Sequence, residues 1–130
     1  MLEKHLDQLG KELGLAVPPP DPQNLRTLTI GKVGVMMKEL DPGIYFQALI
    51  APVPEKKQEE LFMLLMKANF LGQGTGGSTL GLKEDESYLT LSLALPYDMN
   101  YKAFKEALED FVNFVDYWKN QVIQHQMGKS

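Results

Sequence analysis

The stretch RTLTIGKVGVMMKELDPGIYFQALIA, residues 26–51, decides the fold of this chain. Its apolar and polar side chains alternate with a period of two, which is the pattern of half-buried β-strands. Gly31-Lys32 and Asp41-Pro42-Gly43 interrupt this alternation with residues that favour turns. The stretch therefore predicts a three-stranded antiparallel meander, whose first strand lies at an edge of the sheet.

Helical patterns precede and follow this meander. Leucines at positions 2, 6, 9 and 13 share one stripe of a helix that Gly14 ends, and the proline-rich residues 18–22 form an extended spacer after it. Residues 55–70 predict a second helix. Apolar residues from Tyr101 to Val122 repeat with helical spacing and predict a long third helix, followed by a frayed tail at Gln124–Ser130.

A hairpin separates the second and third helices. Residues 79–83 and 88–95 read as two strands joined across Glu84-Asp85-Glu86, and the leucines of the second strand all point to one face. The predicted order is αβββαββα, an antiparallel β-sheet packed with three helices in the α+β class. The length of 130 residues suits a single domain over residues 1–130.

Composition excludes several classes of function. The chain has 13 Lys and Arg against 17 Asp and Glu, and this net charge of −4 argues against a general nucleic-acid binder. It has no cysteine, which removes thiolate metal sites, thiol catalysis and disulfides and fits a reducing compartment. No signal-peptide pattern or membrane-length apolar run appears. We expect a soluble, cytoplasmic protein that does not insert into membranes.

The sequence contains no convincing catalytic motif. Gly72-Gln73-Gly74-Thr75-Gly76-Gly77 matches a dinucleotide-binding fingerprint by letters, but this loop leaves a helix and enters a strand, which reverses the required order. His5 and His125 lie far apart and are expected at the surface. We expect the acidic side chains to be exposed to solvent. We therefore expect no enzyme activity, no metal and no cofactor, with a small-molecule site at Gly72–Gly77 as a minor alternative.

The second predicted helix is apolar around its whole circumference, through the run Leu61–Met66. One face of a small sheet cannot bury such a helix completely, so it needs a second apolar surface. A copy of the same chain is the simplest candidate. The alternative is a helix enclosed inside the monomer.

At this point the pattern resembles a known family. LFMLLMKANF at 61–70, the glycine-bearing loop, STLGLK at 78–83 and the leucine-alternating strand before Pro96 are together similar to the class I (CesT/Tir-type) chaperones of bacterial type III secretion. The most specific part is Leu64-Leu65 with Ala68-Asn69, followed by Leu80-Gly81-Leu82. The resemblance implies a homodimer that binds the extended N-terminal chaperone-binding region of one or more secreted effectors and keeps them secretion-competent.

The resemblance also implies two sets of site residues. The implied dimer interface is Leu61, Leu64, Leu65, Met66, Leu80 and Leu82. The implied effector-binding groove is Leu6, Leu9, Leu13, Leu28, Ile30, Val35, Met37 and Phe46, although the sequence does not fix which strand face is groove and which is core. A subunit of a heterodimeric secretion chaperone, or a regulator, is the alternative, and the secretion ATPase is a possible further partner.

Overall fold

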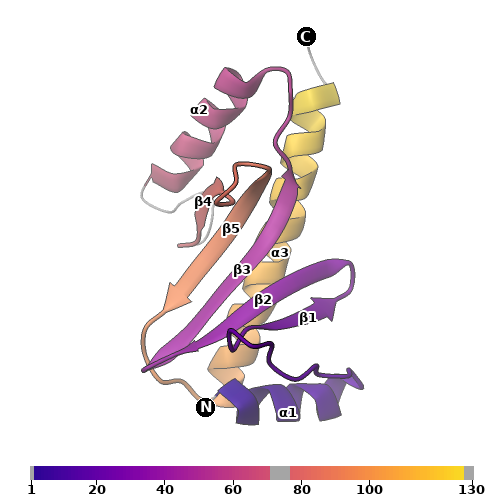
Figure 1. Cartoon of the computed structure of the whole chain (residues 1–130), viewed down its shortest axis with the longest axis vertical. Coiled ribbons are helices and arrows are strands. Elements are labelled where there is room, and N and C mark those ends of the chain that lie inside the picture. Colours follow the sequence, from indigo (N-terminus) through magenta and orange to yellow (C-terminus); the bar gives the residue numbers. More distant parts are fainter. Residues whose placement is uncertain (1, 71–76, 128–130) are drawn as a thin grey trace.

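The computed structural model describes residues 2–70 and 77–127 of the chain. Its elements follow the order αβββαββα, which confirms the predicted α+β fold (Figure 1). Their bounds are α1 Leu2–Leu13, β1 Arg26–Ile30, β2 Val33–Leu40, β3 Gly43–Pro52, α2 Gln58–Asn69, β4 Thr79–Leu82, β5 Tyr88–Leu95 and α3 Tyr101–Met127.

The strands form one antiparallel sheet in the order β1-β2-β3-β5-β4. The meander is therefore as predicted, and β1 lies at one edge and β4 at the other. The pairing of β2 with β3 covers only Met36–Leu40 and Gly43–Gln47. Beyond that point β2 stays paired with β1 and β3 stays paired with β5, so the β1–β2 hairpin diverges from the upper part of β3 (Figure 1).

The core lies between one face of the sheet and α3, which runs behind the strands in Figure 1. Alternate strand residues such as Val35, Phe46 and Leu91 point into it, as expected from the period of two. The buried residues of α3 recur at helical spacing: Phe104, Leu108, Phe111, Val115, Trp118 and Val122. Leu2, Leu6 and Leu9 of α1 close the same core beside the first turns of α3.

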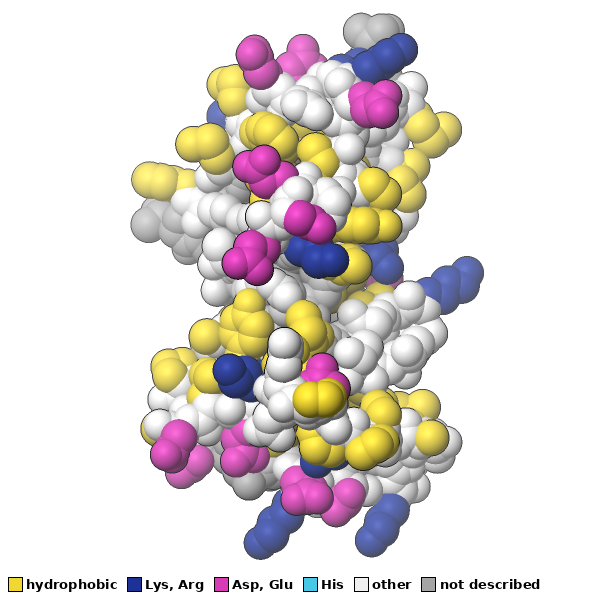
Figure 2. Space-filling view, viewed as in Figure 1, with side chains coloured by type: hydrophobic (Ala, Val, Ile, Leu, Met, Phe, Trp, Pro, Cys, Tyr) yellow, Lys and Arg dark blue, Asp and Glu magenta, His cyan; other side chains and the backbone are white. Residues whose placement is uncertain are grey.

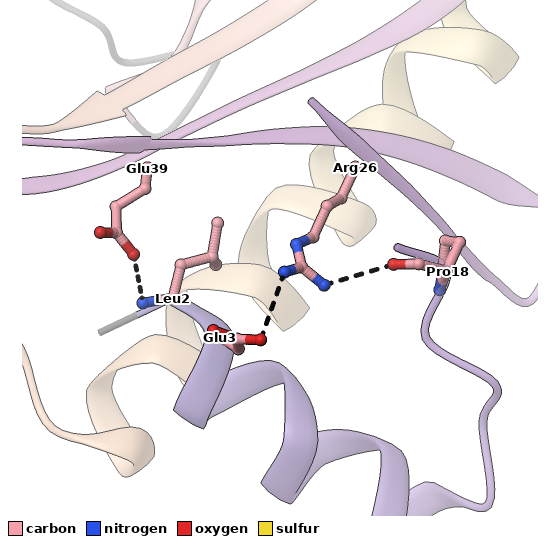
Figure 3. Close-up of polar contacts among 5 residues, drawn as sticks. All are labelled: Leu2, Glu3, Pro18, Arg26 and Glu39. Carbon is pink, nitrogen blue, oxygen red and sulfur yellow. Dashed lines mark hydrogen bonds and ion pairs between the residues drawn. The ribbon is translucent and has the colours of Figure 1, made fainter. Parts of the chain in front are cut away.

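Polar contacts fix α1 against the sheet (Figure 3). The backbone N–H of Leu2 donates to Glu39 Oε1 of β2 at 2.8 Å, which places a carboxylate at the positive end of the helix dipole. Arg26 of β1 lies 3.8 Å from Glu3 and donates from Nη1 to the Pro18 carbonyl oxygen at 3.3 Å. These contacts hold both the start of α1 and the proline spacer. Gly14 ends α1 at a φ of 67°, as its position predicts.

Two helix boundaries differ from the prediction. The second helix begins at Gln58, later than expected, because Lys57 adopts a left-handed conformation with φ of 61°. The third helix continues through Met127, so residues 124–127 are not the predicted frayed tail. Residues 101–127 contain no proline or glycine that would end the helix, and His125 lies 3.9 Å from Glu60 of α2. Residues 128–130 lie outside the described residues.

Candidate protein-binding surfaces

The predicted effector groove is largely part of the core. Six of its eight residues are buried inside the single chain: Leu6, Leu9, Leu28, Val35, Met37 and Phe46. Four of them lie on the strand face that α3 and α1 cover, and Leu6 and Leu9 of α1 pack in the same core. This corrects their placement, because a side chain buried in its own chain has no surface to offer. Leu13, which is 48% exposed, and the half-buried Ile30 remain accessible.

These two residues belong to a cleft of about 270 Å³ between the end of α1, the end of β1 and the first half of α3. We call it the α1 cleft. Its walls are mainly aliphatic, and polar side chains of α3 stand among them. The lining residues are Leu9, Leu13, Ile30, Lys105, Leu108, Glu109, Val112 and Asn113. An aliphatic depression of this size can receive one or two apolar side chains of a partner.

An ion-paired cluster joins α1 to α3 beside the α1 cleft. The ammonium of Lys105 pairs with Glu12 Oε1, and the Tyr101 hydroxyl donates to Glu12 Oε2 at 3.1 Å. The hydrogen bonds from Lys105 and then Tyr101 lower the pKa of Glu12, and the same contact raises the pKa of Lys105. Desolvation and then Glu12 raise the pKa of Tyr101. The cluster therefore holds one wall of the cleft in place with its charges compensated.

Both histidines have structural contacts. His5 Nε2 donates to the Met99 carbonyl oxygen at 2.9 Å, and its ring stacks on Phe104 with centroids 5.1 Å apart. The expectation of two surface histidines is therefore wrong, since His5 and His125 are both half-buried. Among residues 2–70 and 77–127, no three His, Cys, Asp or Glu side chains form a group that could hold a metal ion.

The predicted dimer residues divide between the core and the surface. Leu61, Leu65 and Leu80 are buried in the single chain, and Leu64 is half-buried. Leu61, Leu65 and Leu80 therefore belong to the core of the single chain. Met66 and Leu82 are exposed. Helical spacing places Met66 beside the exposed Met63 of the same apolar run, and Phe70 at the helix C-cap is exposed as well. We call Met63, Met66 and Phe70 the α2 face.

Asn69 closes one edge of the sheet. Its side-chain amide donates from Nδ2 to the Leu80 carbonyl oxygen and accepts through Oδ1 from the Leu80 N–H, both at 2.8 Å. The amide thus occupies positions that a neighbouring strand would take on β4. Sequence reasoning placed Asn69 in the family resemblance without giving it a role. Its one visible signal is an amide residue at the end of an apolar helical run.

The Gly72–Gly77 loop lies outside the described residues except for Gly77, so the minor small-molecule alternative stays a prediction. For the described part of the chain, no helix has both the length and the apolar character needed to cross a membrane.

Comparison with known proteins identifies the family. The model of the Tir chaperone protein (CesT) family matches residues 4–119. A Chlamydia pneumoniae protein named CPj0713/CpB0740 is 27% identical over 122 residues, which cover 91% of this chain and 93% of that protein.

Solved structures share the fold. The ExsC–ExsE complex matches with a TM-score of 0.75 at 16% identity, covering 92% of this chain and 91% of the other. The HopA1–SchA chaperone–effector complex matches with a TM-score of 0.69 at 15% identity, covering 92% of this chain and 93% of the other. The E. coli protein YbjN, which is not described as a secretion chaperone, matches with a TM-score of 0.63 at 16% identity. This match covers 97% of this chain and 93% of the other. Identities this low establish similarity of fold alone.

Proposed function

The chain belongs to the Tir chaperone protein (CesT) family, and from this premise we propose that it is a type III secretion chaperone. It would bind an extended N-terminal segment of one or more secreted effectors and keep them competent for secretion. We propose that it acts by binding alone, without an enzymatic step, in the bacterial cytoplasm. Contact with the secretion ATPase stays a prediction from the family resemblance.

The α1 cleft is the observation that supports this function. Ile30 ends β1, the edge strand, so a segment that pairs with β1 passes beside the cleft. Backbone hydrogen bonds to an edge strand and apolar side chains in an adjacent cleft are one established mode of peptide recognition. A disordered segment loses about 2–5 kcal/mol or more on ordering, so a single cleft is insufficient. We therefore expect an effector to wrap across more than one surface.

Leu13→Lys tests the α1 cleft. Leu13 is 48% exposed at the end of α1, where a lysine is compatible with the helix dipole, so the fold should persist. A charge on the cleft wall should remove apolar contact with the effector. We expect a tagged Leu13→Lys chain purified from its native bacterium to retain at least tenfold less effector by quantitative mass spectrometry than the unmodified chain.

Ile123→Lys is the matched control, because Ile123 is 52% exposed on α3 and lies outside the cleft. This variant should retain the effector. The captured protein should be protected from limited proteolysis in its N-terminal segment, which should be extended. Equal effector retention by both variants, or protection of a folded domain instead, would contradict the proposed function.

We also propose that the chain forms a homodimer through the α2 face. Its three large apolar side chains are exposed at 59%, 71% and 71%, and they lie on the last turns of α2 and, for Phe70, at its C-cap. Exposed apolar clusters of this kind are typical of interaction surfaces. The same face would serve a heterodimeric chaperone, so the state of the isolated protein separates the two alternatives.

A further inference from the structure

The sheet contains an opening between β2 and β3 that is separate from the α1 cleft. Past Met36 and Gln47, the edges of β2 and β3 that face one another separate. Among the described residues, 48, 49, 51 and 52 of β3 pair only with β5, residue 50 lies at a bulge, and 33–35 of β2 pair only with β1. An unpaired strand edge presents backbone donors and acceptors to an incoming chain. We call the space between these two edges the sheet notch.

The sheet notch has a volume of about 390 Å³. Figure 2 shows that the molecule is hollowed at mid-height on the face where the sheet lies in front of α3. Met36 is half-buried and Leu49 is 44% exposed, so the notch offers apolar surface from both strands. Its lining includes Gly34, Met36, Gln47, Leu49, Lys83 and Lys119.

Gly34 is the residue that points to another backbone as the occupant. It lies inside β2 without the positive φ that would require glycine. A Cβ built there would meet only Thr27 Cγ2, at 3.9 Å, so the fold leaves room for a side chain. A glycine in a strand interior often marks a place where a ligand or another backbone approaches closely. Here the glycine stands on the wall of the notch.

The charges of the notch select the chemistry of the occupant. Lys83 and Lys119 are its charged lining residues. Lys83 lies near Asp85, whose pKa is lowered mainly by hydrogen bonds from Ser87 and to a lesser extent by Lys83. In the described part of the chain, no ion pair joins Lys119 to a carboxylate. A segment with a carboxylate beside apolar residues would complement this lining.

We propose that the sheet notch is a second docking site for the bound effector. An extended segment with alternating apolar residues pairs with the free edge of β3 and places an Asp or Glu side chain near Lys119. The proposal rests on the proposed function, because the occupant is part of the protein that the chain chaperones. It adds a second recognition element, separated from the α1 cleft by the β1–β2 hairpin.

Two synthetic peptides test the chemistry of the notch. Both have about ten residues of alternating valine and threonine, with two polar positions changed to Asp in one peptide and to Lys in the other. In titrations of the ¹⁵N-labelled full chain, the Asp peptide should shift the amide signals of Gly34, Met36 and Leu49. One screened ion pair predicts about two- to fivefold tighter binding than the Lys peptide, and Lys119→Glu should reverse the preference. No shift, or equal binding of both peptides, would overturn the proposal.

Gly34→Val tests the approach of a backbone. The valine should fit the strand and fill the notch, and we expect at least a tenfold loss of Asp-peptide binding. Gly81→Val is the matched control, since a Cβ at this other strand glycine would meet only Thr90 Oγ1, at 3.8 Å. Unchanged peptide binding by a folded Gly34→Val would contradict the proposal. If Gly34→Val does not fold, the effect of Lys119→Glu on the preference between the two peptides tests the proposal instead.

The effector measurement separates this proposal from the proposed function. If Leu13→Lys loses the effector and Gly34→Val retains it with the same protected segment, the notch proposal fails and the chaperone function stands. Loss of effector from both variants supports both. If the unmodified chain retains no secreted protein, the proposed function fails and the notch proposal fails with it.

Discussion

At the scale of single residues, Asn69 shows how one side chain replaces a strand. Its amide satisfies both backbone groups of Leu80 at 2.8 Å, next to the buried side chain of Leu80. Removing it leaves an N–H and a C=O without these partners at a partly buried position. We expect Asn69→Ala to lower the free energy of unfolding by about 1–3 kcal/mol.

Urea unfolding measures this loss, and hydrogen exchange should show a faster amide at Leu80. Asn120→Ala is the control, because Asn120 is an exposed residue on α3, and exposed substitutions usually change stability by less than about 0.5 kcal/mol. Equal stability of the two variants would show that the Asn69 contacts contribute nothing.

Residue-level prediction from the sequence succeeded for strand periodicity and left the role of each strand face open. The alternation of Leu28, Val35 and Phe46 was visible, because it depends only on local spacing. Whether α1 and α3 cover that face or leave it to a partner depends on contacts between residues far apart in the chain. Leu13 and Ile30, the last residues of α1 and β1, are the two that stay accessible.

At the scale of elements, α1 carries both core and surface leucines, and its two roles can be measured separately. Leu6 is 1% exposed and packs in the core, whereas Leu13 stands at the cleft. We expect Leu6→Ala to lower the free energy of unfolding by about 2–5 kcal/mol through the lost contacts and the cavity. Leu13→Ala, the control, should change it much less. Urea unfolding of both variants checks this. A small effect of Leu6→Ala would contradict the core role of Leu6 and favour its predicted place in the effector groove.

The divergence of β2 from β3 shows why element-level prediction stops at pairing. The period-two pattern continues through Val33–Val35 and through Ala48–Ile50, so it predicts two full strands. It carries no information on where their edges separate, because strand twist and the packing of α3 set that point. The end of α3 likewise lies against α2, where His125 is 3.9 Å from Glu60, a residue distant in sequence.

At the scale of the whole molecule, the two edges of the sheet differ in structure. The β4 edge is closed at Leu80 by Asn69, and α2 beside it turns an apolar face outward. Within the described residues no strand lies beyond the β1 edge, and the α1 cleft lies at its end. Self-association through α2 would leave the β1 edge, the α1 cleft and the sheet notch available in both copies. A long unfolded segment could then contact several sites on one dimer, which raises its effective concentration at each.

Met66→Asp tests this arrangement, since Met66 is 71% exposed and its substitution should not disturb the monomer core. We expect sedimentation to show a dimer for the unmodified chain and a monomer for Met66→Asp, because a charge would be buried in an apolar interface. Met127→Asp, at an 81% exposed methionine of α3, should remain dimeric. A dimer that survives Met66→Asp would contradict the α2 interface. An unmodified chain that is monomeric alone would instead favour a heterodimeric chaperone, in which a different protein covers the α2 face.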